Sequence, residues 1–262
     1  MAPNMQMVPP AFFWYYHCGF ADNWNRREWN DPAMQREFDE YFNESLQRGW
    51  WPNARPGPDQ PPRVYFEVGG NTMRRTRGGQ NQLLNSLWPK LKCAVTVDWR
   101  MNTTGLLSDY FLPVAHHYEK IAFMFPTPQL MSLTFSDKAV EPPPDVKGEV
   151  EIGLLLAEKL QERATARGMT EYTDGRGTTR RMDDLIDRYT VNGAFRASEP
   201  IAREWVSDSA ASGNFEADFD FDKLREKGYQ RFKNWGIGPM GHSQAAEIKE
   251  DDTHTAFQWH VE

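Results

Sequence analysis

The sequence has very little cysteine, with only Cys18 and Cys93 among its 262 residues. Since iron–sulfur clusters and structural zinc sites usually need several thiolates, the thiols of this chain alone cannot build either. A disulfide between the two stays open, but we interpret both as packed thiols, because Cys93 begins an apolar segment and free cysteine packs as a small hydrophobe. The six histidines also lack the spacing of metal ligands, so we predict no metal site.

Long apolar runs and an excess of basic residues are absent as well. No run approaches the roughly 18 apolar residues that cross a bilayer, and the first residues lack the basic segment and cleavage site of a signal peptide. The chain carries 30 Lys and Arg against 37 Asp and Glu, a formal net charge of −7 and a pI near 5.5. We therefore predict no direct membrane insertion and no nucleic acid partner.

Against this acidic background, basic residues gather after one apolar segment. Residues 64–68 read as a strand and are followed by Gly69 and Gly70. Three arginines with no acid among them come next: Arg74, Arg75 and Arg77. Glycines let backbone N–H groups approach an anion, and guanidinium groups add charged, bidentate donors. The pattern predicts a phosphate-binding loop.

The segments around this loop predict a βαβ unit in an α/β fold. Residues 80–88 read as a helix that Pro89 stops, residues 93–97 as a second strand and residues 110–115 as a third. Because the carboxyl ends of parallel strands share one edge, the loops after the first two strands should face the same crevice. The first loop departs from the G-x-G-x-x-G spacing of dinucleotide-binding proteins.

The loop after the second strand, residues 98–105, is polar. Asp98 could accept paired hydrogen bonds from a ribose diol or from the edge of a guanine, while Arg100, Thr103 and Thr104 could meet phosphate or base. The alternative is a capped turn, in which Asp98 and Thr103 bond to local backbone. Both interpretations are open on spacing alone.

Composition divides the chain into three predicted parts: an aromatic and helical segment (1–62), a Rossmann-like lobe (63–168) and a helical part with a final strand (169–262). The aromatic run 12–16 predicts a strand or extended segment under a core, or a surface covered by sequence outside this chain. Residues 31–50 predict a helix with Asp31 as its N-cap, and residues 149–167 another. The uncovered start and the unpaired last strand lead us to expect a segment of a longer protein.

Several motifs occur in a recognisable order, at residues 69–79, 87–92, 95–104, 108–113 and 117–120. They closely resemble the molybdopterin oxidoreductases of the dimethyl sulfoxide reductase family. Within it, the resemblance is to the branch of respiratory nitrate reductase, nitrite oxidoreductase, perchlorate, chlorate and selenate reductase and ethylbenzene dehydrogenase. It is dense from about residue 60 to 168.

This resemblance implies a partial molybdopterin oxidoreductase fold whose Rossmann-like lobe grips one of two molybdopterin guanine dinucleotides around a molybdenum ion. It implies no catalytic residue and no metal ligand within this chain. The cofactor contacts that it implies are Gly69, Gly70, Asn71, Arg74, Arg75, Arg77, Asp98, Arg100, Thr103, Thr104 and Asp109.

The resemblance also implies a function and partners. The chain would be a portion of a catalytic subunit that performs two-electron oxygen-atom transfer or hydroxylation in anaerobic or nitrogen-oxyanion respiration. The iron–sulfur cluster and the protein ligand to molybdenum would lie in a more amino-terminal portion, so we expect the isolated chain to be inactive. The remainder of the subunit and an iron–sulfur beta subunit would be its partners.

Two alternatives and the compartment stay open. The chain could be a stand-alone nucleotide-binding or interaction module without redox activity, or a non-functional truncated paralogue. Relatives occupy both sides of the membrane, so a periplasmic or a cytoplasmic location, with membrane association through partner subunits, fits the resemblance equally well.

Overall fold

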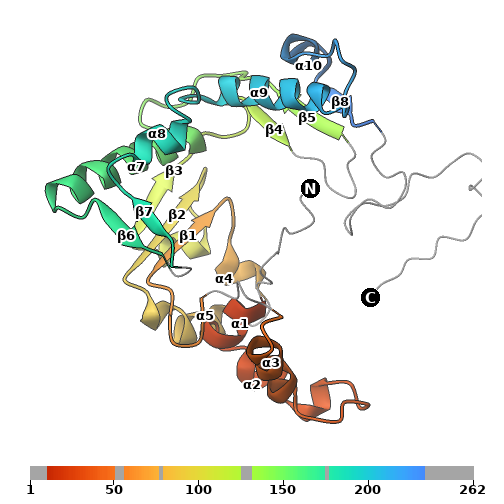
Figure 1. The fold of residues 1–262 in the computed structure, drawn as a ribbon, viewed down its shortest axis with the longest axis vertical. Coiled ribbons are helices and arrows are strands. Elements are labelled where there is room, and N and C mark those ends of the chain that lie inside the picture. Colours follow the sequence, from red (N-terminus) through yellow and green to blue (C-terminus); the bar gives the residue numbers. More distant parts are fainter. Residues whose placement is uncertain (1–10, 51–55, 77–78, 125–131, 175–176, 234–262) are drawn as a thin grey trace, which may run out of the picture. The chain divides into compact units, whose positions relative to one another are not determined.

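The computed structural model describes residues 11–50, 56–76, 79–124, 132–174 and 177–233. Contacts divide the chain into two compact units, Met1–Val114 and Ala115–Glu262. The described parts of both units contain helices and strands (Figure 1), which confirms the predicted mixed α/β class. The predicted limits at residues 62 and 168 stay a prediction. Within the described ranges, no helix is long and apolar enough to cross a membrane.

The first unit is built on a three-stranded parallel sheet of β1 (Val64–Val68), β2 (Cys93–Asp98) and β3 (Tyr110–Pro113), in the order β1-β2-β3. Val64 pairs with Cys93, and Val95 pairs with Tyr110. The three strands lie side by side in Figure 1. The central strand β2 is buried along most of its length, as a strand with neighbours on both sides should be. The predicted βαβ unit is confirmed.

Short helices connect these strands. They are α4 (Thr72–Arg75), α5 (Gly79–Ser86), the 3₁₀ helix η2 (Trp88–Lys90) and α6 (Thr103–Leu106). Leu83 and Leu87 are spaced by one helical turn and are fully buried with Cys18 and Met73. Burying a side chain of this size stabilises the fold by about 1.5–3 kcal/mol. This core fixes α4 and α5 beside β1.

The aromatic run of residues 12–16 is helical, and the predicted strand is wrong. It forms α1 (Ala11–His17), followed by α2 (Ala21–Trp24) and η1 (Arg27–Trp29). Phe12 and Tyr15 are buried, and their rings lie 4.7 and 4.4 Å from the ring of Phe42. A spacing of three residues places both rings on one helical face, so the run packs against a later helix of the same chain.

This later helix is α3 (Phe38–Gln47), which begins after the predicted start at Pro32. The Asp31 carboxylate accepts a hydrogen bond from Ala33 N at 2.8 Å, closing a local turn. Such side-chain-to-backbone bonds compete with helix formation. Asp31 is therefore a turn residue, and Glu37 is the N-cap.

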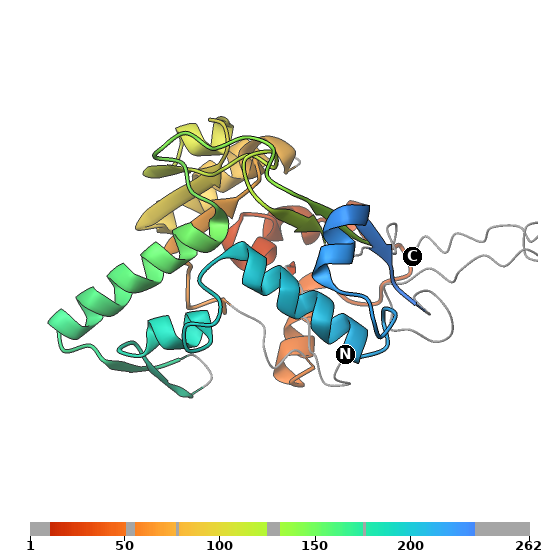
Figure 2. The same cartoon turned by 90° about the horizontal axis from the view of Figure 1, so that it is seen from above.

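The second unit contains an antiparallel sheet in the order β4-β5-β8, made of β4 (Ala122–Met124), β5 (Ser132–Ser136) and β8 (Tyr229–Arg231). Helices α9 (Ser198–Ala211) and α10 (Phe221–Lys227) accompany it, as Figure 2 shows. Leu133 and Phe135 from β5 pack with Val206 from α9 and Leu224 from α10. The predicted last strand at 256–261 lies outside the described residues.

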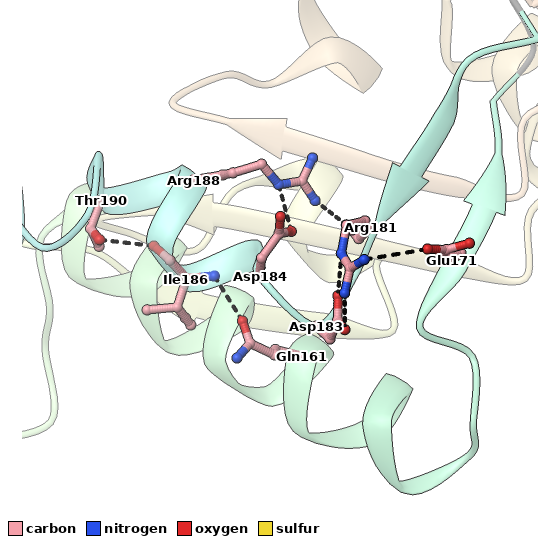
Figure 3. Close-up of polar contacts among 8 residues, drawn as sticks. All are labelled: Gln161, Glu171, Arg181, Asp183, Asp184, Ile186, Arg188 and Thr190. Carbon is pink, nitrogen blue, oxygen red and sulfur yellow. Dashed lines mark hydrogen bonds and ion pairs between the residues drawn. The ribbon is translucent and has the colours of Figure 1, made fainter.

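The long helix α7 (Glu149–Ala166) matches its prediction and contacts α8 (Leu185–Thr190). Along the chain, the two helices are connected by an antiparallel hairpin of β6 (Glu171–Thr173) and β7 (Thr179–Arg181). Gln161 accepts a hydrogen bond from Ile186 N at 2.8 Å, and Arg181 pairs with Asp183 and Glu171 (Figure 3). Exposed ion pairs contribute about 0–1 kcal/mol each, so these contacts orient the hairpin more than they stabilise it.

Candidate functional site

Two polar loops meet where β1 and β2 end. Gly69 N donates to Val97 O at 2.9 Å and extends the strand pairing, while Asn102 Nδ2 donates to Gly70 O at 3.0 Å. Gly69 has φ of 64°, a left-handed conformation that glycine adopts without steric cost. The loops after the two strands therefore lie together, as the parallel sheet predicts.

The arginines lie in and after the short helix α4. Arg74 and Arg75 form its last turn, and both side chains are exposed. Within the described residues, neither side chain makes an ion pair or a hydrogen bond. Yet the helix is held at the tip of β2, because Met73 N donates to Thr104 Oγ1 at 3.1 Å. Two cations with no partner in the described part of the chain thus follow the joined strand ends; Arg77 lies outside the described residues.

An open hollow of about 530 Å³ lies beside α4. Arg74 and Thr103 line it from the two loops, and Gln80 and Asn81 line it from the start of α5. The remaining described residues around it are Met73, Thr76 and Gly79. Among these lining residues only Arg74 is charged. The described lining of the hollow therefore offers a cation, two hydroxyls and two amides to a ligand, and it includes no carboxylate that would repel an anion.

Asn71, the N-cap of α4, is oriented by the second loop. Its Oδ1 accepts hydrogen bonds from Thr104 N at 3.2 Å and from Thr104 Oγ1 at 3.0 Å. Since a backbone N–H can only donate, the oxygen of this amide must face Thr104. The Nδ2 group consequently keeps its two N–H donors unused by described residues.

Thr104 itself is fully buried. Its hydroxyl donates to Asn71 and accepts from Met73 N, so it is used inside the protein. The structure thus places Thr104 between the loops, where it joins them, and not at the surface where a predicted cofactor contact would lie.

Asp98 ends β2 and is only 8% exposed. One carboxylate oxygen accepts from Trp99 N at 2.7 Å and the other from Asn102 Nδ2 at 2.7 Å. These contacts match the capped-turn alternative. Thr103, by contrast, lines the hollow, so the two residues of this loop take different positions.

The two remaining predicted site residues, Arg100 and Asp109, lie in different surroundings. Arg100 is exposed and its guanidinium lies 4.5 Å from the centre of the Trp99 ring, a cation–π contact worth about 0.5–1 kcal/mol at an exposed site. Asp109 accepts from Ala94 N at 2.8 Å, near the amino end of β2. That is about 13 Å along the strand from Asp98. The structure does not bring Asp109 to the other candidates.

Sequence reasoning missed Glu67, a carboxylate that is 8% exposed at the end of β1. It accepts hydrogen bonds from Thr72 N at 3.1 Å, from Thr72 Oγ1 and from the Tyr65 hydroxyl. Burial, and then the hydrogen bond to Glu67, raise the pKa of Tyr65 well above its ordinary value. The available signal was an acid inside an otherwise apolar strand.

Comparison with known proteins gives a consistent set of relatives, although no model of a protein family matches the chain. The alpha subunit of perchlorate reductase from Dechloromonas aromatica is 29% identical over 235 residues, which is 88% of this chain and 24% of the relative. The alpha subunit of respiratory nitrate reductase from Haloferax mediterranei is 33% identical over 188 residues, or 70% and 17%. The alpha subunit of dimethylsulfide dehydrogenase from Rhodovulum sulfidophilum is 29% identical over 176 residues, or 65% and 18%. The chain thus spans about a quarter or less of each.

Proposed function

Because this chain belongs to the dimethyl sulfoxide reductase family of molybdopterin oxidoreductases, we propose that it binds the guanine dinucleotide end of the molybdopterin cofactor. The site is the pair of loops at the ends of β1 and β2. The observation that carries the proposal is the pair of exposed arginines in α4, Arg74 and Arg75, which have no acidic partner among the described residues.

The donors present fit a diphosphate. Its two negative charges match the two guanidinium groups, and charge-assisted hydrogen bonds contribute about 1.5–3 kcal/mol each. The Asn71 amide and the backbone N–H of Gly70 add uncharged donors, and Thr103 adds a hydroxyl next to Arg74, whereas the N–H of Gly69 is used by Val97 O. By sequence, Arg77 belongs to the same loop. The hollow beside α4 has room for such a group.

The second loop supports the nucleotide end. Asp98 would accept from a ribose or guanine through the lone pairs that Trp99 and Asn102 leave unused, because each carboxylate oxygen can accept more than one hydrogen bond. Arg100 would supply a further cation. These residues bind and orient the cofactor. When bound, its molybdenum supplies two-electron oxygen-atom transfer or hydroxylation.

The remaining parts of the activity would come from outside this chain. We place the iron–sulfur cluster and the protein ligand to molybdenum in other portions of the catalytic subunit, and an iron–sulfur beta subunit as its electron-transfer partner. The relatives support this arrangement, since each is named as an alpha subunit and is at least about four times longer than its match to this chain. The isolated chain should show no turnover.

The stand-alone nucleotide-binding module is the weaker alternative, because four alpha subunits of oxidoreductases match most of the chain. A competition experiment separates the two functions. If molybdopterin guanine dinucleotide displaces GDP at lower concentration than unlabelled GDP does, the cofactor role is supported. A clear preference for GDP supports the module.

The arginine pair gives the direct test. We expect Arg74→Ala combined with Arg75→Ala to weaken binding of GDP to the chain at least about 100-fold, since two charge-assisted hydrogen bonds are lost. Titration calorimetry measures this loss. Arg167→Ala is the matched control, because Arg167 is exposed and makes no described ion pair. Equal affinity of the double variant and the control, or no binding by the unchanged chain, would contradict the proposal.

A further inference from the structure

Glu67 is a buried carboxylate, and both of its oxygens accept hydrogen bonds from other residues of the protein. Its Oε1 accepts from Thr72 N, and its Oε2 accepts from the hydroxyls of Thr72 and Tyr65. Burying a carboxylate is costly unless hydrogen bonds replace its lost hydration. The three donors satisfy this requirement, so the charge is tolerated even though it lies near a site proposed for an anion.

Gly70 shows how closely the chain passes this carboxylate. A Cβ atom at Gly70 would lie 2.1 Å from Glu67 Oε1 and 3.0 Å from its Cδ, closer than packed atoms allow. The absence of a side chain at this position therefore lets the loop fold over Glu67. The glycine that was predicted to approach a phosphate also approaches a carboxylate.

The helix that Glu67 contacts is too short to hold its own orientation. α4 has four residues, whereas isolated helices below about 12 residues are marginal in water. Its first residue, Thr72, is bonded to Glu67, and its second, Met73, is bonded to Thr104. These two anchors precede Arg74 and Arg75 directly, so they determine where the arginine side chains start.

We infer that Glu67 is a positioning residue for diphosphate binding: it fixes the first turn of α4 and thereby the direction in which Arg74 and Arg75 present their charge. This inference rests on the proposed function. Glu67 contributes no ligand contact of its own. It keeps the two arginines near one geometry before the ligand arrives, which reduces the conformational entropy lost on binding.

Three variants of the chain test this role, with GDP as the probe. Glu67→Ala removes both acceptors of Thr72, and we expect a loss of affinity of about tenfold. Glu67→Gln keeps one oxygen acceptor and should recover most of that affinity. Tyr65→Phe is the control: it removes the Tyr65 hydroxyl, which contacts Glu67 and Thr72 Oγ1, but leaves both bonds between Glu67 and Thr72, so the affinity should change less than about twofold.

Amide hydrogen exchange in the absence of ligand supplies a second readout. Exchange at Thr72 should accelerate in Glu67→Ala, while exchange at Leu83 and Leu87 in the neighbouring core stays unchanged. An unchanged affinity in Glu67→Ala, with the unchanged chain binding GDP, overturns the inference. Acceleration throughout the unit overturns it too, because the effect is then general unfolding. If the unchanged chain does not bind GDP, the proposed function fails, and unchanged Thr72 exchange in Glu67→Ala separately refutes the anchoring.

Discussion

At the scale of single residues, one hydroxyl group joins the two loops of the candidate site. Thr104 Oγ1 accepts from Met73 N and donates to Asn71 Oδ1, and the residue is fully buried. A buried polar group that loses its partner costs about 1–3 kcal/mol. The stability of this corner of the first unit therefore depends on an oxygen at position 104.

Replacing that oxygen should be measurable. We expect Thr104→Val, which keeps the shape but removes the hydroxyl, to lower the free energy of unfolding by about 1–3 kcal/mol. Thr104→Ser keeps the hydroxyl and should cost less. Urea denaturation followed by fluorescence gives both values. A valine variant that is as stable as the serine variant would show that the hydroxyl does not join the loops.

The location of a residue in the fold could be predicted where its position along a strand decides it. Gly69, Gly70 and Arg74 follow β1 in the sequence, so the parallel sheet brings them to the end of β2. The partner of a side chain is harder to predict, because it depends on three-dimensional neighbours. The Asp98 carboxylate accepts hydrogen bonds from Trp99 and Asn102 in its own turn, and the Asp109 carboxylate accepts one from Ala94 N near the amino end of β2.

The surroundings of Glu67 could not be predicted from the sequence. An acid between apolar strand residues is usually read as a position that faces water. Here its donors come from residues 65 and 72, which become neighbours only once β1 is followed by α4. The sequence contained the residues but not their proximity.

At the scale of secondary-structure elements, long periodic segments were predicted well and aromatic ones were not. Helix α7 and strands β1 and β2 lie within a residue of their predicted limits. The aromatic run has strand propensity, yet α1 forms because Phe12 and Tyr15 can pack on Phe42 from one helical face. Tertiary packing outweighs local propensity in this segment.

His17, at the end of α1, makes the first unit sensitive to pH. It is 1% exposed, and its Nε2 donates to Gly57 O at 2.9 Å. Burial lowers its pKa below the ordinary value of 6.5, an effect that the backbone acceptors oppose. As the pH falls through 6.5, the unfolded chain gains a proton before the folded chain does. Stability is therefore lost as the pH falls and retained above 6.5.

We expect the melting temperature of the chain to fall between about pH 7.5 and pH 5.5, with His17 contributing part of the fall. His17→Gln keeps an N–H donor for Gly57 but does not titrate, so its melting temperature should vary less over this range. Differential scanning calorimetry at several pH values measures the difference. Identical pH profiles for the two proteins would contradict the account of His17.

At the scale of the whole molecule, the chain consists of two compact units, and the candidate site lies within the first. The hollow and the described site residues all fall before Val114. The family was predictable from the order of several motifs, because such an order is more specific than one glycine-rich loop. The activity was not, since this chain spans about a quarter or less of its relatives.

The most direct test of the central claim is chemical footprinting of arginine by phenylglyoxal, read by mass spectrometry. In the free chain, the exposed Arg74, Arg75 and Arg167 should all be modified. With saturating molybdopterin guanine dinucleotide, Arg74 and Arg75 should become protected while Arg167 reacts as before. Equal reactivity of all three with and without the dinucleotide would contradict the assignment of this loop to the diphosphate.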